Sequence, residues 1–166
     1  VQSNAFKPLD FIDLYFEGLP PSLTQHRFFN EVVRFLEDSV DDDFYQCRYT
    51  VCHGDLNHNN FMLDENQKLF LVDWEGVKIA DPISDLTWFL LQYFKPSEWM
   101  DWFDRYQFDF DDSFYKRVKW YSLMNCLLLI KQYTLENRPQ QVNQFILLLR
   151  NIYQSEDQAK GGFYAP

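Results

Sequence analysis

The sequence contains no long uninterrupted run of apolar residues. Apolar residues make up 46% of the 166 residues, but no run reaches the roughly 18 residues that suggest a membrane span. No N-terminal signal peptide is recognisable. We therefore expect one domain with a substantial core and no membrane partner.

Cysteine and basic residues are also scarce. The three cysteines, Cys47, Cys52 and Cys126, lack metal-ligand spacing and are typical of free thiols in a reducing compartment, which predicts a cytoplasmic location. With 15 basic and 25 acidic residues the net charge is −10, which argues against nucleic-acid binding. That charge would suit a cationic substrate, but an acidic soluble surface accounts for it equally well.

The apolar pattern is mainly helical. Helical spacing covers about 9–16, 23–40, 81–95, 96–106, 113–135 and 139–153. The segment 113–135 is apolar nearly all round and should run through the middle of the bundle. We expect Ser22 to cap the second helix with Gln25 as its partner, and Tyr93 to lie on the buried face of the third. The tail around Gly161 and Gly162 is expected to be poorly ordered.

One segment, 61–72, has the pattern of a β-hairpin. Residues 61–63 form the first expected strand, 64–67 the turn and 68–72 the second strand. A hairpin brings its ends together, so Asn60 and Asp73 should lie side by side, with Asp55 on the loop just before. The predicted fold is thus mainly α with a small β-hairpin.

These three polar residues suit one kind of chemistry. An amide oxygen beside a carboxylate suits a hard cation such as Mg²⁺, and the second carboxylate, Asp55, could accept a proton from a hydroxyl. This is the equipment of metal-assisted phosphoryl transfer. Taken singly, each residue has a structural explanation as a turn or cap residue, but their joint spacing favours a site.

The order of these motifs resembles a known family. The chain closely resembles the aminoglycoside phosphotransferase and choline kinase family in four successive elements. These are His53-Gly54-Asp55, then Asn60, then Asp73-Trp74-Glu75 and the segment 81–86. These are small-molecule kinases with a protein-kinase-like fold. The resemblance is strong over residues 51–90, and the flanking helices match the C-terminal, helical lobe of that fold in order and length.

The resemblance implies a role for each motif residue. Asp55 would be the catalytic base, and Asn60 and Asp73 would hold Mg²⁺ against the phosphates of ATP or GTP. His53 would shape the catalytic loop. Asp85 would be a buried anchor that accepts hydrogen bonds from this loop, and Glu75 would be a further candidate for metal or substrate contact.

The acceptor that the resemblance implies would be a small molecule with a hydroxyl group. Its identity stays open among choline, ethanolamine, thiamine, an aminoglycoside, an amino sugar or another alcohol. Trp99, Asp101 and Asp104, with other acidic and aromatic residues of the segment 99–112, could bind an amine through charge and cation–π contact. A helix pair with an aromatic core and an acidic exterior accounts for the same pattern.

Part of a kinase is not recognisable. None of the five glycines stands in a phosphate-covering loop, and the one lysine before the catalytic loop, Lys7, is not in a strand pattern. We therefore expect 1–166 to be a single domain, the C-terminal lobe, without the nucleotide-binding N-terminal lobe. By itself it should show almost no kinase activity.

Two other functions remain as alternatives. A metal-dependent phosphoesterase would use the polar residues crowded at 53–59, but two-metal sites need more ligands than the three histidines of the chain suggest. A non-catalytic, kinase-like binding module is the second alternative.

Overall fold

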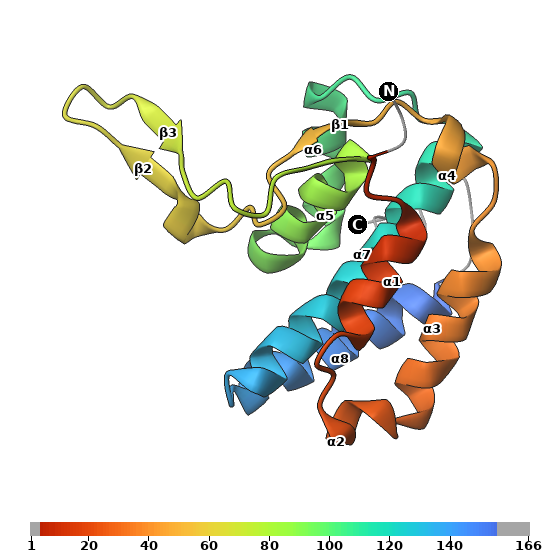
Figure 1. The fold of residues 1–166 in the computed structure, drawn as a ribbon. Helices are drawn as coiled ribbons and strands as arrows, with labels where there is room; N and C mark the ends of the chain where they lie inside the picture. The colour runs from red at the N-terminus through yellow and green to blue at the C-terminus, as the bar shows by residue number, and fades with distance from the viewer. Residues whose placement is uncertain (1–3, 156–166) are drawn as a thin grey trace.

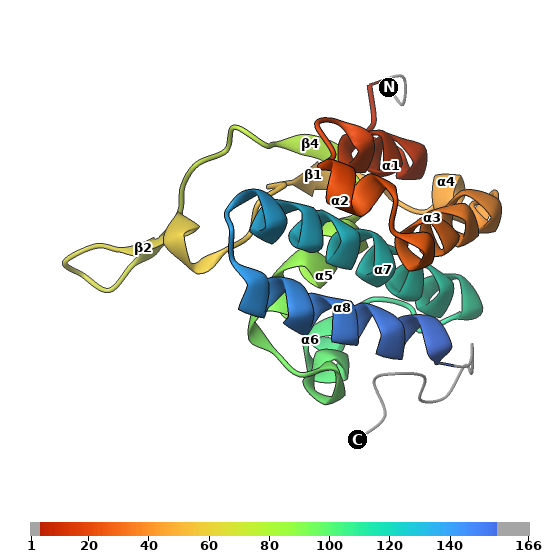
Figure 2. The same cartoon turned by 90° about the horizontal axis from the view of Figure 1, so that it is seen from below.

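The longest helix, α7 (Asp112–Leu135), lies at the centre of the protein. The structure, a computed structural model, describes residues 4–155. Helices α1 (Pro8–Phe16), α3 (Arg27–Ser39), α5 (Pro82–Tyr93) and α8 (Pro139–Gln154) pack around α7 (Figures 1 and 2). The side chains of α7 are buried on all sides between Trp120 and Leu127, which confirms the predicted central helix.

The remaining helices are short. They are α2 (Pro21–Thr24), α4 (Asp43–Gln46), α6 (Trp99–Arg105) and two 3₁₀ turns, η1 (His58–Asn60) and η2 (Pro96–Glu98). Each segment with helical spacing contains a helix, although the segment 23–40 is divided between α2 and α3, and the mainly α prediction is confirmed. The tail at Gly161 and Gly162 lies outside the described residues.

Two details of the helix prediction were wrong. The second helix does not start at Ser22, which lies inside the single turn α2; instead α3 begins at Arg27, and the side chain of His26 accepts a hydrogen bond from the Phe29 N–H. The extended backbone of His26 (ψ 110°) separates the two helices. Tyr93 is 39% exposed because it is the last residue of α5 and its hydroxyl is turned to the loop at His58.

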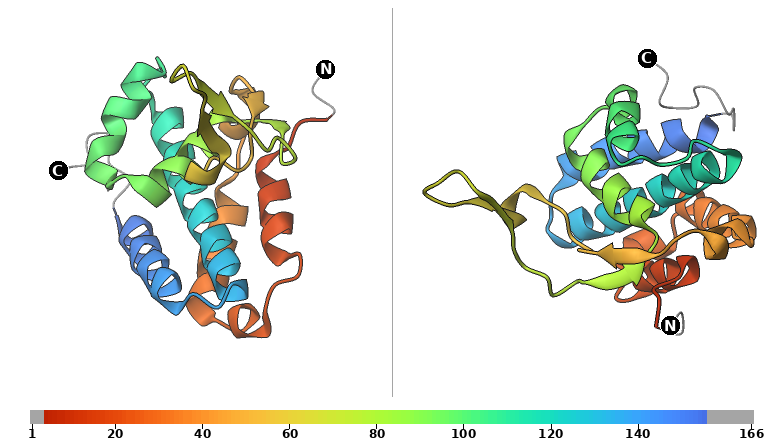
Figure 3. Two further views of the ribbon diagram at one scale, coloured as in Figure 1. Left: turned by 90° about the vertical axis from the view of Figure 1, so that its left-hand side faces the viewer. Right: turned by 90° about the horizontal axis from the view of Figure 1, so that it is seen from above.

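The predicted hairpin is present and projects from the helical body (Figures 1 and 3). Strand β2 (Phe61–Leu63) pairs antiparallel with β3 (Leu69–Leu71), with Phe61 opposite Leu71. The turn is built by Asp64, whose carboxylate accepts the N–H groups of Asn66 and Lys68. Several side chains of this hairpin are exposed although they are apolar: Met62, Leu63, Leu69 and Phe70.

A second sheet was not predicted. Strand β1 (Thr50–Cys52) pairs antiparallel with β4 (Lys78–Ala80), with Val51 opposite Ile79. The partner of β1 comes from beyond the hairpin, so no local pattern indicates the pairing. This sheet joins the two ends of the segment that carries the predicted site.

The core is rich in aromatic rings, as the composition predicts. Fully buried rings include Tyr15, Phe29, Phe44, Trp99, Phe103, Phe114, Trp120 and Tyr121. Within residues 4–155, no helix is both long and apolar enough to span a bilayer.

Candidate active site

The loop that follows β1 is held by one carboxylate on α5. Asp85 Oδ2 accepts the backbone N–H of His53 at 2.6 Å, and Oδ1 accepts that of Gly54 at 2.9 Å. Two adjacent N–H groups bound by one carboxylate fix the direction of the backbone as it enters Asp55. Helix α5 is itself held by Asp81, whose side chain accepts the N–H of Ile83 at its start.

Burial raises the pKa of Asp85 above its ordinary value of 3.8, although the hydrogen bonds from Gly54 and His53 act in the opposite direction. Because the folded-state pKa is raised, protonation of Asp85 stabilises the folded protein. This stabilisation is complete below the ordinary pKa of the carboxyl and is lost as the pH rises through its raised pKa in the folded protein. Asp85→Asn does not titrate. Urea unfolding at several pH values should therefore show the wild type gaining stability relative to Asp85→Asn as the pH falls below neutral. If the free energy of unfolding of the wild type, relative to that of Asp85→Asn, stays constant or decreases as the pH falls, the prediction is wrong.

The imidazole of His53 links the loop to the end of the hairpin. His53 is buried, its Nδ1 accepts the Asp55 N–H at 3.2 Å, and its Nε2 lies 2.8 Å from the Val72 carbonyl. Because Nδ1 accepts, the ring proton is on Nε2, which donates to Val72. The structure thus connects His53 to both segments that carry predicted site residues.

Gly54 stands where a side chain does not fit. Its φ is +89°, and a Cβ atom would lie 2.2 Å from the carbonyl oxygen of Gly76. We expect Gly54→Ala to lower the free energy of unfolding by roughly 2–4 kcal/mol, since backbone strain and a backbone clash add.

The matched control for Gly54→Ala is Gly18→Ala. Gly18 also has a positive φ, +62°, but no atom lies within 4 Å of the position that its Cβ would occupy. Gly18→Ala therefore isolates the backbone strain, which should lower the free energy of unfolding by about 1 kcal/mol. Urea unfolding curves of the two variants compare them directly, and equal losses would contradict the proposed close contact.

Asp55 is half-buried and is contacted by a residue that the sequence did not single out. The indole N–H of Trp88, on α5, donates to Asp55 Oδ1 at 3.3 Å. Trp88 lies three residues after Asp85, so both occupy one face of α5. That spacing was the available signal, because a residue one turn beyond the loop anchor must also face the loop.

Asn60 and Asp73 adjoin as the hairpin predicts. The Val72 N–H donates to the Asn60 carbonyl at 2.9 Å, which places the backbone of Asp73 next to this position. Asn60 is buried, and its Nδ2 donates to the Asp55 carbonyl at 2.8 Å, so its Oδ1 is the free end of the amide. Asp73 is exposed with φ +60° and has no hydrogen bond or ion pair with residues 4–155.

The other candidate residues come from the turn before β4 and from α6. Glu75 is exposed in the turn before β4. Trp99 is fully buried and its indole N–H donates to the Phe94 carbonyl. Asp101 and Asp104 are exposed on α6.

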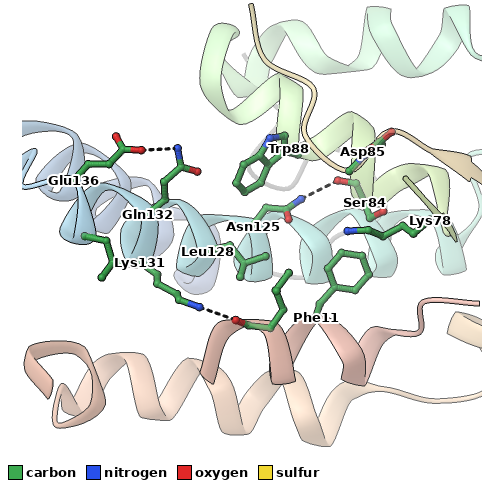
Figure 4. Close-up of a pocket in the computed structure, with 13 residues that line it drawn as sticks. Phe11, Lys78, Ser84, Asp85, Trp88, Asn125, Leu128, Lys131, Gln132 and Glu136 are labelled. Carbon is green, nitrogen blue, oxygen red and sulfur yellow. Dashed lines mark hydrogen bonds between the residues drawn. The ribbon is translucent and has the colours of Figure 1, made fainter. Parts of the chain in front are cut away.

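A cavity of about 400 Å³ opens beside the loop that follows β1, at Gly54. Its lining includes Gly54, Asp85 and Trp88, together with residues of α1 and α7 such as Phe11 and Asn125 (Figure 4). Trp88 therefore forms part of the wall with its ring while its N–H group contacts Asp55. Trp99, Asp101 and Asp104 do not line this cavity.

Three solved structures resemble this chain in fold. A structure of LicA in complex with AMP matches with a TM-score of 0.67 and 19% identity, over 90% of this chain and 56% of that one. The choline kinase LicA from Streptococcus pneumoniae matches with a TM-score of 0.64 and 18% sequence identity. This match covers 89% of this chain and 56% of that one. A thermostable mutant of the aminoglycoside phosphotransferase APH(4)-Ia matches with a TM-score of 0.55 and 16% sequence identity. This match covers 77% of this chain and 45% of that one.

These matches show the helical lobe of a kinase-like fold. The chain spans a little over half the length of the two LicA structures, 56% in each case. The sequence model of the phosphotransferase enzyme family matches residues 10–121, which include the loop after β1, the hairpin and α5. This chain therefore belongs to the phosphotransferase enzyme family.

Proposed function

We propose that this chain is the helical, catalytic lobe of a kinase that transfers a phosphoryl group from ATP or GTP to the hydroxyl of a small molecule. The observation that carries the proposal is the placement of Asp55. Its loop is held by Asp85 and His53, and Trp88 bridges Asp55 to a cavity large enough for a small acceptor.

In this proposal Asp55 accepts the proton of the acceptor hydroxyl. The Trp88 N–H contacts only Oδ1, so Oδ2 is left for the hydroxyl group. The two backbone hydrogen bonds to Asp85 and the Asp55 N–H bond to His53 hold the carboxylate in place before the acceptor binds.

Asn60 and Asp73 fit a magnesium site. The Asn60 amide is oriented by its bond to the Asp55 carbonyl, which leaves Oδ1 free, and the Asp73 carboxylate is uncommitted among residues 4–155. Both are hard oxygen ligands of the kind Mg²⁺ prefers. Bound there, Mg²⁺ would neutralise charge on the nucleotide phosphates.

The nucleotide-binding lobe is proposed to lie outside this chain. No described glycine forms a phosphate-covering loop, and the apolar side chains of β2 and β3 are exposed. We therefore expect the chain alone to bind Mg·ATP only weakly. Isothermal titration measures this affinity directly, and micromolar binding would contradict the proposed division.

A screen of nucleotide consumption tests the function. The protein joined to its nucleotide-binding lobe is incubated with Mg·ATP or Mg·GTP and a library of amino alcohols and sugars. We expect one class of acceptor to accelerate consumption, and Asp55→Ala to abolish that acceleration. If Asp55→Ala leaves phosphorylation unchanged, the lobe is a binding module and the kinase assignment is wrong.

A phosphoesterase receives less support. Among residues 4–155 no three His, Cys, Asp or Glu side chains are grouped as a metal site would require. The three cysteines are free, which supports the proposed cytoplasmic location.

A further inference from the structure

The cavity beside the catalytic loop runs along α7 between α1 and α5 (Figure 4). Its volume of about 400 Å³ lies at the size of small-ligand sites. Given the proposed function, this cavity is where an acceptor would lie. The charges and free polar atoms of its lining then indicate the chemical class of that acceptor.

The two carboxylates in the lining already have partners. Asp85 accepts two backbone N–H groups of the catalytic loop. Glu136, at the far end, accepts from Gln132 at 3.0 Å and lies 3.6 Å from Arg138. Asp85 is therefore committed to the loop, and Glu136 is shared between Gln132 and Arg138 at the far end of the cavity.

The cationic groups of the lining are less committed. Lys131 donates to the Leu14 carbonyl at 2.7 Å. The ammonium group of Lys78, on β4, makes no hydrogen bond or ion pair with residues 4–155, although its charge acts on Asp85. Figure 4 shows its side-chain nitrogen pointing into the space between Asn125 and Phe11. All its N–H donors are thus available to a ligand.

Lys78 also affects the aromatic rings that a cation would use. Its ammonium lies 4.6 Å from the ring centre of Phe6 and 5.7 Å from that of Phe11. A quaternary ammonium near Phe11 would therefore meet a cation already there. Trp88 is then the remaining ring of the lining for stacking, and a single ring does not form an aromatic cage.

The floor of the cavity offers an unpartnered acceptor atom. Asn125 is 2% exposed, and its Nδ2 donates to the Ser84 carbonyl and to Thr87 Oγ1, each at 2.9 Å. Its Oδ1 accepts no hydrogen bond from residues 4–155. A ligand hydroxyl in the cavity can donate to this amide oxygen.

We propose that the acceptor is a hydroxyl-rich molecule without positive charge, such as a sugar, which stacks on Trp88 and hydrogen-bonds to Asn125 and Lys78. This inference rests on the proposed function of the same site. It places the acceptor away from the acidic and aromatic segment 99–112, and it excludes amines of the choline type as preferred acceptors.

Acceptors that differ in charge test the inference. N-acetylglucosamine and glucose are compared with glucosamine, and gluconate is compared with choline. The protein joined to its nucleotide-binding lobe is assayed for nucleotide consumption with each. We expect kcat/KM to favour the uncharged or anionic member by about tenfold or more, because like charges repel in a partly desolvated site.

Variants of Lys78 separate charge from packing. Lys78→Glu should reduce the kcat/KM preference for uncharged or anionic acceptors over cationic ones by about tenfold or more. Lys78→Met keeps most of the packing on Phe11 and should reduce this preference less. Lys68→Glu is the matched control, since Lys68 is exposed on the hairpin, lies over Phe70 and is absent from the cavity lining. It should leave the preference unchanged.

A binding measurement distinguishes the two levels of the proposal. The indole N–H signal of Trp88, assigned by its loss in Trp88→Phe, is followed by NMR while each acceptor is added. Sugars that shift this signal without any nucleotide consumption would contradict the proposed kinase function but support the ligand class. Preferred phosphorylation of amines, or no shift with any sugar or sugar acid, would overturn the inference.

Discussion

Replacing Asp55 by asparagine should lower the rate of phosphoryl transfer by about 10²–10⁴-fold. The amide cannot take the proton from the acceptor hydroxyl. Its oxygen can still accept the Trp88 N–H bond, so the loop should keep its position. The loss should therefore appear in kcat, measured with the acceptor found in the screen, with little change in KM.

Two comparisons define this result. Asp104→Asn changes an exposed carboxylate on α6 that does not line the cavity, and it should leave kcat unchanged. Urea unfolding should show that Asp55→Asn retains most of its stability. A variant that keeps more than about a tenth of the wild-type kcat would show that Asp55 is not the general base.

Replacing Arg117 by methionine should destabilise the protein by about 3–5 kcal/mol, because it leaves the Asp81 carboxylate buried without its cation. Asp81 is fully buried, and its Oδ2 accepts Arg117 Nη1 at 2.7 Å. The same carboxylate holds the start of α5 through Ile83. Urea unfolding followed by far-UV circular dichroism measures the loss.

Arg138→Met is the control for this ion pair. Arg138 and Glu136 are both exposed, and Arg138 Nη1 lies 3.6 Å from Glu136 Oε2. Such surface pairs contribute at most about 1 kcal/mol to the free energy of unfolding. The double variant Asp81→Asn/Arg117→Met removes both charges and should recover part of the stability. Equal losses for Arg117→Met and Arg138→Met would contradict the importance of the buried pair.

The helices were predictable because their apolar spacing is local. The segment 113–135 is apolar nearly all round, and such a helix can be stable only inside a bundle, which is where α7 lies. The start of α3 was missed because capping depends on one backbone conformation. His26 adopts an extended ψ that separates α2 from α3, although the apolar pattern continues across it.

The candidate site was partly predictable for a similar reason. A hairpin brings its ends together, so the proximity of Asn60 and Asp73 follows from residues 61–72 alone. The pairing of β1 with β4, and the contact of Trp88 with Asp55, were not predicted, since both join residues about thirty positions apart.

The sequence by itself determined the family, the helical class and the positions of Asp55, Asn60 and Asp73, since these depend on local spacing and motif order. Only the tertiary structure decided the surroundings of Asp55. The cavity takes its walls from α1, α5 and α7, and the free groups of Lys78 and Asn125 meet there. A cavity is formed by side chains from separate segments, so its charge and shape follow from packing and from no single stretch of the chain.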